Sequence, residues 1–216
     1  MNSKTVIFDM DGVLVESGPF HLEAWQLLGK KYGMEVKEGL FYETFGMRND
    51  ELMPRLFPGV FKPEDYNAIH EEKEKYYREC AKGKIEAPIG LIDFIEELKT
   101  NQFILAVGSS APRANIEFIL DELKIRKFFD HSVSGHEVNR GKPAPDVFIA
   151  AAKKCGVSAD QCVVIEDAVA GVEAAKAAHM KCVAITSSTP REKLCGADLV
   201  VDSFRELKVS SIIDLL

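Results

Sequence analysis

Short, continuous apolar runs recur along the chain, and segments with apolar residues at helical spacing lie between them. The runs span residues 6–8, 104–107, 131–133, 162–165, 182–185 and 198–201. Their lack of polar alternation is typical of strands that are covered on both faces. Helical spacing marks residues 91–99, 114–123, 145–154 and 170–178. This alternation predicts an α/β fold, a Rossmann-like, doubly wound parallel sheet with helices on both faces.

Nearly a hundred residues separate the first apolar run from the next clear one, which is too long for a loop. Helical patterns fill most of this gap, at residues 20–32, 40–44, 49–56 and 63–81. The sequence therefore predicts a helical domain, residues 17–87, inserted into an α/β domain, residues 1–16 and 88–216. Charges alternate over residues 71–75, which we expect to form an exposed helix face.

Composition and charge narrow the classes of partner. The chain of 216 residues is 46% hydrophobic and 28% charged and carries a formal net charge of -7, with no long basic run. This argues against nucleic acid or an anionic membrane as the main partner. No apolar stretch approaches the roughly 20 residues of a membrane span. The first strand follows Lys4 directly, so we expect no signal peptide.

The cysteines indicate the compartment. There are five, an odd number, and no two of them form a C-x-x-C pair. This pattern predicts free thiols in a reducing cytoplasm. Cys162 and Cys182 lie in apolar runs, where we expect them to act as small buried hydrophobic residues.

Two aspartates, Asp9 and Asp11, follow the first apolar run, and Gly12 comes directly after them. Two carboxylates at the mouth of a buried strand repel each other, by about 4 kcal/mol at ~4 Å and an effective dielectric constant of ~20. A hard divalent cation with oxygen ligands would offset this repulsion. The alternative is that the aspartates only serve as turn and cap residues at a strand end.

Polar side chains follow four of the predicted strands. They are Asp9 with Asp11, Ser109 with Ser110, Lys142, and Glu166 with Asp167. The carboxyl ends of parallel strands meet at one edge of a sheet, where ligands bind in such folds. Carboxylates, a hydroxyl and an ammonium group together suit phosphoryl transfer. Taken singly, Ser109 could instead cap a helix and Lys142 could be an ordinary surface lysine.

These segments resemble, in the same order, the four motifs of the haloacid dehalogenase superfamily. Residues 8–13 (FDMDGV) are similar to the first motif and Ser109 to the second. Lys142, within residues 141–146 (GKPAPD), is similar to the third, and Glu166-Asp167 to the fourth. The nearest resemblance is to the β-phosphoglucomutase-like sugar phosphatases and mutases, and the helical insert resembles the small helical cap of that family.

The resemblance implies roles for the residues at the sheet edge. Asp9 would be the nucleophile that forms an aspartyl-phosphate, and Asp11 would protonate the leaving group and then activate water. Ser109 would bind the phosphoryl group with Ser110 beside it, and Lys142 would neutralise charge on Asp9 and the phosphate.

The resemblance also implies the cofactor Mg²⁺. Asp9, the backbone carbonyl of Asp11, and Asp167 would bind the ion, and Glu166 would lie near it. A dehalogenase is disfavoured, because it needs neither Asp11 nor the Glu166-Asp167 pair.

Three positions in the insert bear on the substrate. His21 would contact Asp11, or it is a helix residue packed at the hinge. Arg48 is an expected anion or sugar contact, with a surface ion pair as the alternative. The mutases have this arginine one position later, so the segment is more similar to the sugar phosphatases. Lys73 lies where the subgroup often places a cap lysine, or it is a solvated helix charge. Trp25 is expected to pack within the cap.

Two positions near the fourth motif carry structural expectations. Gly171 lies among small residues and is expected to allow close packing of a helix on the sheet. His179 stands where the family usually has glycine; if that position needs a left-handed backbone, histidine costs some stability.

The sequence thus predicts a Mg²⁺-dependent phosphatase that acts on a small phosphorylated metabolite, a sugar monophosphate above all. The alternatives are a β-phosphoglucomutase-type phosphotransferase and a non-catalytic protein that binds a phosphorylated metabolite. The expected partner is the small substrate, without nucleic acid or membrane, and the expected state is a monomer.

Overall fold

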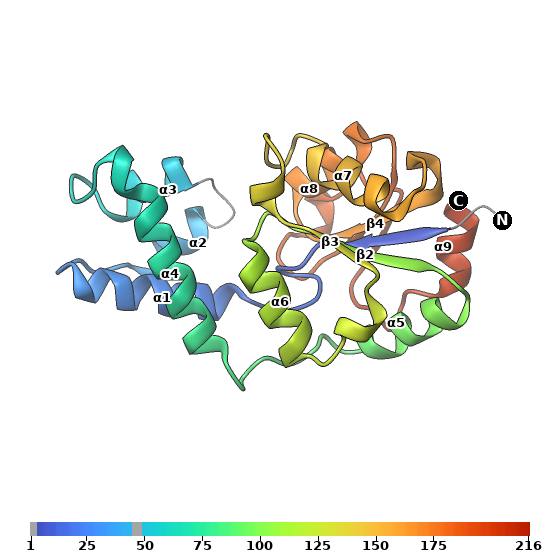
Figure 1. Cartoon of the computed structure of the whole chain (residues 1–216), viewed down its shortest axis with the longest axis horizontal. Helices are drawn as coiled ribbons and strands as arrows, with labels where there is room; N and C mark the ends of the chain where they lie inside the picture. Colours follow the sequence, from blue (N-terminus) through green and yellow to red (C-terminus); the bar gives the residue numbers. More distant parts are fainter. Residues whose placement is uncertain (1–3, 45–48) are drawn as a thin grey trace. The chain divides into compact units, whose positions relative to one another are not determined.

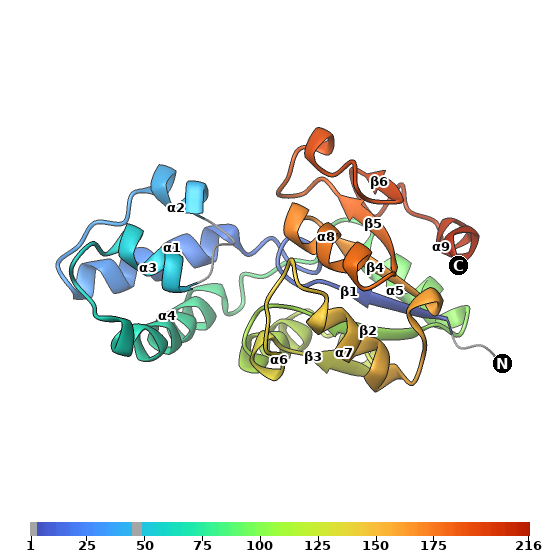
Figure 2. The same cartoon turned by 90° about the horizontal axis from the view of Figure 1, so that it is seen from above.

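The computed structural model describes residues 4–44 and 49–216. The chain forms two compact units, one of Ser17–Lys84 and one of Met1–Glu16 with Ile85–Leu216. We call the first the helical unit and the second the α/β unit, and describe each by itself (Figures 1 and 2).

The α/β unit is built on one parallel sheet, as the apolar runs predict. Within the described residues it has six strands in the order β3-β2-β1-β4-β5-β6. The strands are β1 (Thr5–Phe8), β2 (Ile104–Gly108), β3 (His131–Val133), β4 (Cys162–Glu166), β5 (Lys181–Ile185) and β6 (Leu199–Val201). Each predicted run matches its strand to within one residue at either end, because fully buried strands have unmistakably apolar sequences.

The strand order creates a switch point at the centre of the sheet. From β1 the chain adds β2 and β3 on one side, and then crosses to add β4, β5 and β6 on the other. At such a point the loops that follow two neighbouring strands leave in opposite directions and open a crevice at their carboxyl ends. The two strands at this switch point are β1, which Asp9 follows directly, and β4, which ends at Glu166.

Helices cover both faces of the sheet (Figure 1). One face carries α7 (Asp146–Cys155) and α8 (Val169–Ala177), and the other carries α5 (Leu91–Thr100), α6 (Arg113–Glu122) and α9 (Val209–Leu215). Successive residues of β1 point to opposite faces. Ile7 belongs to the core under α7 and α8, whereas the ring of Phe8 lies 6.5 Å from that of Phe94 on α5. The short helix α9 is absent from the prediction.

Short 3₁₀ helices join the main elements: η1 (Pro63–Asp65), η2 (Arg126–Phe128), η3 (Gly135–Glu137), η4 (Ala159–Gln161) and η5 (Arg191–Lys193).

The helical unit contains α1 (Gly18–Lys31), α2 (Glu38–Thr44), α3 (Asn49–Leu56) and α4 (Tyr66–Ala81). Its longest helices, α1 and α4, pack along each other. Trp25, Leu28, Phe41 and Phe57 form the centre of its core, which confirms the packing role predicted for Trp25.

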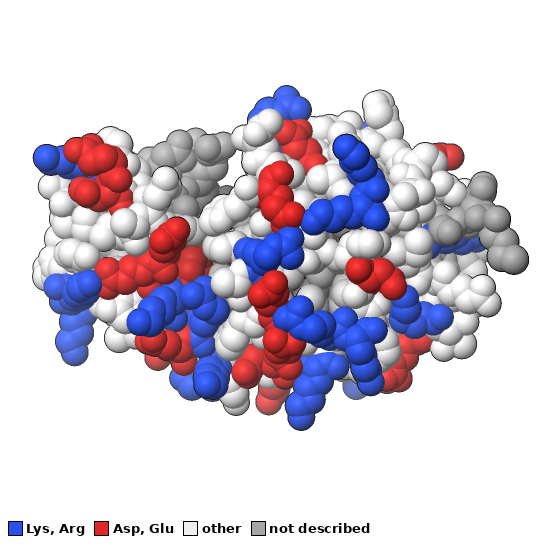
Figure 3. All heavy atoms as spheres, viewed as in Figure 1, with Lys and Arg blue, Asp and Glu red and all other residues white. Residues whose placement is uncertain are grey.

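The five cysteines are free thiols, and Cys162 and Cys182 are fully buried as predicted. Among the helices of residues 4–44 and 49–216, none combines the length and the apolarity of a membrane span. On the face shown in Figure 3, acidic and basic side chains are interspersed and neither gathers into a continuous patch.

The backbone at His179 is left-handed, with φ 58°. This is the conformation in which we expected histidine to cost some stability relative to glycine. This conformation costs a non-glycine residue about 1 kcal/mol. We expect His179→Gly to raise the free energy of unfolding by about that amount, measured by urea denaturation. Glu173→Gly, inside α8, is the opposite control and should lower it by about 1 kcal/mol, because glycine weakens a helix interior. A loss of stability in His179→Gly would contradict the argument.

Candidate active site

Asp9 is held at the carboxyl edge of the sheet by the neighbouring strand. Its backbone N–H donates to the carbonyl of Ile165 on β4 at 2.9 Å, which extends the pairing of β1 with β4 by one residue. The Asp9 side chain is nearly buried, at 7% exposure for the residue. The strand order therefore places Asp9 next to the Glu166-Asp167 pair at the end of β4.

Lys142 reaches Asp9 from a distant part of the chain. It lies in the loop between β3 and α7, 133 residues from Asp9 in the sequence. Its Nζ donates to Asp9 Oδ1 at 2.6 Å and to Glu166 Oε1 at 2.5 Å, and lies 4.8 Å from the ring centroid of Phe148. The side chain is 10% exposed, so the alternative of a surface lysine is wrong.

Glu166 is fixed at both of its carboxylate oxygens. Oε1 accepts from Lys142, and Oε2 accepts from the backbone N–H groups of Asp167 at 2.8 Å and Ala168 at 3.0 Å. A Cβ at Gly171 would lie only 1.8 Å from Glu166 Oε1. The glycine therefore makes room for this carboxylate. This confirms the expectation that Gly171 allows close packing of α8 on the sheet, and the residue it approaches is Glu166 at the end of β4.

Three carboxylates converge beside Lys142. Oxygens of Asp9, Glu166 and Asp167 lie within 4.8 Å of one another. Gly12 opens space for one of them, because a Cβ there would lie 1.9 Å from Asp167 Oδ2, and its φ of +82° also favours glycine. A compact group of carboxylate oxygens against a backbone without a side chain fits a hard divalent cation.

The electrostatics of the cluster also fit a cation. Burial, together with the negative charges of Glu166, Asp167 and Asp11, raises the pKa of Asp9 well above its usual range despite the attraction of Lys142. Burial and the charge of Glu166 raise the pKa of Asp167 to about 7. Burial opposes the charge of Lys142, but attraction to Asp9 and Glu166 outweighs it and raises the pKa of the ammonium. One ammonium thus leaves the carboxylates with uncompensated negative charge.

The two serines follow β2 at the same edge. Ser109 is 1% exposed, and its Oγ accepts from the N–H of Ala111 at 3.1 Å. The next helix, α6, begins later, with Pro112 at its N-cap position, so the alternative role of Ser109 as a helix cap is wrong. Ser110 is exposed. Its carbonyl packs against Gly135, where a Cβ would lie 2.3 Å from the oxygen.

A further loop with hydroxyl side chains, which the sequence did not lead us to predict, contacts the site. Ser187 donates to the carbonyl of Gly12 at 2.5 Å, and Ser188 donates to the carbonyl of Asp167 at 3.3 Å. The two serines thus join the turns that follow β1 and β4. The run of hydroxyl residues directly after β5 is the signal that could have identified them.

The predicted substrate residues of the insert have different outcomes. Arg48 lies outside the described residues. His21 and Lys73 come together inside the helical unit, with Lys73 Nζ 2.7 Å from His21 Nδ1. Lys73 and Glu74 are each 4% exposed, so the exposed face expected for residues 71–75 is wrong at these two positions. The two opposite charges pair with each other at 2.8 Å, and this pairing offsets the cost of burying them.

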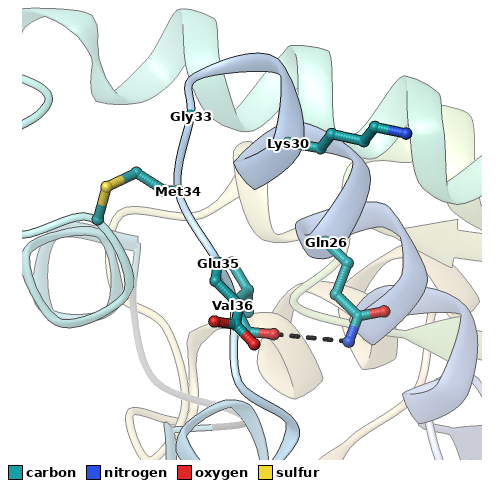
Figure 4. A pocket seen from close by; sticks show the side chains of 6 residues that line it. All are labelled: Gln26, Lys30, Gly33, Met34, Glu35 and Val36. Atoms are coloured by element: carbon teal, nitrogen blue, oxygen red, sulfur yellow. Dashed lines mark hydrogen bonds between the residues drawn. The ribbon is translucent and has the colours of Figure 1, made fainter.

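A shallow, open pocket of about 500 Å³ lies elsewhere, on the helical unit near the end of α1. Figure 4 shows its lining: Gln26, Lys30, Gly33, Met34, Glu35 and Val36. Gln26 Nε2 donates to the carbonyl of Val36 there at 3.5 Å. The lining holds a single carboxylate and exposed polar side chains. The converging carboxylates and Lys142 make the sheet edge the better candidate for chemistry.

Comparison with known proteins finds relatives over most of the chain. The family model described as haloacid dehalogenase-like hydrolase matches residues 3–179. The phosphorylated carbohydrates phosphatase of Thermotoga maritima is 33% identical over 182 residues, which cover 82% of each chain. The fructose-1-phosphate phosphatase YqaB of Escherichia coli is 32% identical over 178 residues, 82% of this chain and 94% of that protein.

Two further matches bear on length and fold. The chloroplastic 5-amino-6-(5-phospho-D-ribitylamino)uracil phosphatase of Arabidopsis thaliana is 31% identical over 211 residues. That match covers 97% of this chain but only 56% of the plant protein. Among solved structures, the β-phosphoglucomutase of Clostridium difficile superposes with a TM-score of 0.85 at 28% identity, covering 99% of this chain and 96% of that chain.

Proposed function

The chain belongs to the haloacid dehalogenase-like hydrolase family, in its subgroup of sugar phosphatases and mutases. We propose that it is a Mg²⁺-dependent phosphatase whose substrate is a small phosphorylated metabolite, a sugar monophosphate. One observation carries the proposal: the Lys142 ammonium bridges Asp9 and Glu166 at the edge where the parallel strands end. The names of two relatives, both phosphatases of phosphorylated carbohydrates, support the substrate class.

Asp9 and Asp11 would carry the two half-reactions. The Asp9 carboxylate attacks phosphorus, the ester bond breaks, and Asp11 gives its proton to the departing alcohol oxygen. Asp11 then takes a proton from water as that water attacks the aspartyl-phosphate on Asp9. The second step releases inorganic phosphate and restores both carboxyl groups.

Lys142 and the serines would prepare Asp9 and the phosphate for this attack. Burial raises the pKa of Asp9, yet the reaction needs its ionised form, and the ammonium at 2.6 Å favours that form. The same charge offsets the developing charge on the phosphoryl oxygens. The Ser109 hydroxyl would donate to one of these oxygens, with Ser110 next to it.

The residues that would hold Mg²⁺ are Asp9, the backbone carbonyl of Asp11, and Asp167. When bound, the ion shields the attacking carboxylate from the negative phosphate. Glu166 has both oxygens engaged with Lys142 and backbone N–H groups. We therefore place it beside the metal as the residue that anchors Lys142.

We further propose that residues 1–16 and 88–216 form the catalytic domain and that residues 17–87 form a cap that selects the substrate. In this cap His21, Lys73 and Arg48 remain the predicted substrate residues. The free thiols favour a reducing compartment, and we place the protein in the cytoplasm as a monomer.

A phosphomutase is the second candidate, favoured by the likeness to a β-phosphoglucomutase over nearly the whole chain. The two activities would share the residues at the sheet edge. They would differ in whether water or a second sugar phosphate removes the phosphoryl group from Asp9.

Phosphorus NMR separates the candidates. The protein would be mixed with Mg²⁺ and β-glucose 1-phosphate, with a trace of glucose 1,6-bisphosphate as primer. Release of inorganic phosphate, here or across a panel of sugar monophosphates, is the expected result. Formation of glucose 6-phosphate without free phosphate would establish a mutase. No reaction with any member of the panel would favour the non-catalytic binding protein.

A further inference from the structure

The loop that follows β5 is held in place by the end of β6. We call this loop, residues 186–191, the hydroxyl loop. At one end the Thr186 hydroxyl donates to Asp202 Oδ1 at 2.8 Å, and at the other end Arg191 Nη2 donates to the same oxygen at 2.8 Å. Arg191 Nη1 also donates to the carbonyl of Val200 on β6 at 2.9 Å. One carboxylate thus ties both ends of the hydroxyl loop to the end of β6, which restricts the movement of the residues between them.

The hydroxyl loop holds the turn that follows β1. The Ser187 hydroxyl donates to the carbonyl of Gly12 at 2.5 Å, and the N–H of Gly12 donates to the carbonyl of Val15 at 2.8 Å. That N–H and the carbonyl of Asp11 belong to one planar peptide group, so they turn together. The two hydrogen bonds therefore fix both peptide groups of Gly12, and with them the direction of the Asp11 carbonyl.

The hydroxyl loop also holds the turn that follows β4. The Ser188 hydroxyl donates to the carbonyl of Asp167 at 3.3 Å, and the N–H of Asp167 donates to Glu166 Oε2 at 2.8 Å. Both backbone polar groups of Asp167 are therefore engaged. Its carboxylate lies against the first turn, because a Cβ at Gly12 would come within 1.9 Å of Asp167 Oδ2. Adjacent serines thus join the two turns that carry the proposed metal ligands.

We propose that Ser187 and Ser188 are positioning residues of the cation site, which set the spacing between the Asp11 carbonyl and the Asp167 carboxylate. They act through backbone carbonyls and do not touch the ion themselves. Mg²⁺ requires nearly ideal octahedral geometry, so a small displacement of one turn relative to the other weakens its binding. Both serines are exposed, and a hydrogen bond there contributes only modestly to folding. The inference rests on the proposed function because it takes Mg²⁺ as the ion.

Isothermal titration calorimetry of the full chain with MgCl₂, after removal of metal with EDTA and dialysis, tests the inference without substrate. We expect the double variant Ser187→Ala/Ser188→Ala to bind Mg²⁺ about tenfold more weakly than the parent, as is typical when groups that orient metal ligands are removed. The double variant Ser187→Thr/Ser188→Thr keeps both hydroxyl groups and should bind as tightly as the parent. Each single alanine variant should show part of the loss, and the single variants decide the test if the double variant fails to fold.

Ser158→Ala is the matched control. Ser158 is an exposed serine before the other end of β4, and its hydroxyl donates to Gln161 Oε1 at 3.0 Å. Its removal should leave the affinity for Mg²⁺ unchanged. If the parent binds Mg²⁺ and the alanine variants bind it equally well, or if the threonine variant loses as much affinity as the alanine variant, the inference is overturned and the proposed function stands. A parent that does not bind Mg²⁺ would overturn both.

Discussion

Asp9→Asn is expected to abolish turnover while the protein remains folded. The amide cannot attack phosphorus as the carboxylate does, so kcat should fall by about 10³-fold or more. Lys142 keeps its second partner, Glu166, so the ammonium is not left unpaired. The measurement is phosphate release from the substrate found by NMR, with circular dichroism to establish folding. Turnover within tenfold of the parent would exclude Asp9 as the nucleophile.

The same variant has a predicted effect on stability that depends on pH. In the native protein the pKa of Asp9 is raised, chiefly by burial. Between the unfolded pKa, about 3.9, and the higher folded value, the native state binds more protons than the unfolded state, so the parent loses stability as pH rises. Asparagine removes this loss. Urea denaturation with EDTA present should show the variant gaining on the parent as pH rises above 4, and a constant difference would contradict this account.

Gly171→Ala is expected to have the second largest effect. The new Cβ would lie 1.8 Å from Glu166 Oε1, a contact that cannot exist, so the carboxylate must move. Because Glu166 holds Lys142 at 2.5 Å, the ammonium loses one of its two carboxylate partners. Disturbing a buried ion pair should lower the free energy of unfolding by about 3 kcal/mol. Displacement of Lys142 should reduce kcat about 10²-fold.

Gly39→Ala is the control for this substitution. Gly39 also lies in a helix, α2, but a Cβ there meets nothing within 4 Å. Alanine favours a helix over glycine by up to about 1 kcal/mol, so this variant should be as stable as the parent or more so. Urea denaturation and phosphatase assays would be run on both variants. A Gly171→Ala protein as stable and active as Gly39→Ala would show that the position of Glu166 does not depend on the glycine.

Much of the α/β unit could be predicted from the sequence because its signals are local. A strand covered on both faces must be apolar throughout. Apolar runs such as residues 162–165, which alternate along the chain with helical segments, therefore predict buried strands. Asp9, Ser109, Lys142 and Glu166 were predicted to gather because parallel strands end at one edge. The short helix α9 was missed because seven residues carry too little periodicity to be recognised.

The sequence by itself determined the parallel sheet, the helical insert and the side chains that meet at the sheet edge. Only the tertiary structure decided how those side chains are paired. It decided that Lys142 bridges Asp9 and Glu166, that Gly171 makes room for Glu166, and that Lys73 and Glu74 are buried where alternating charges predicted an exposed face. The physical reason is that periodicity reports which face of an element is apolar. The partner of a charge depends instead on residues far away in the sequence, such as Lys142 and Asp9, which only folding brings together.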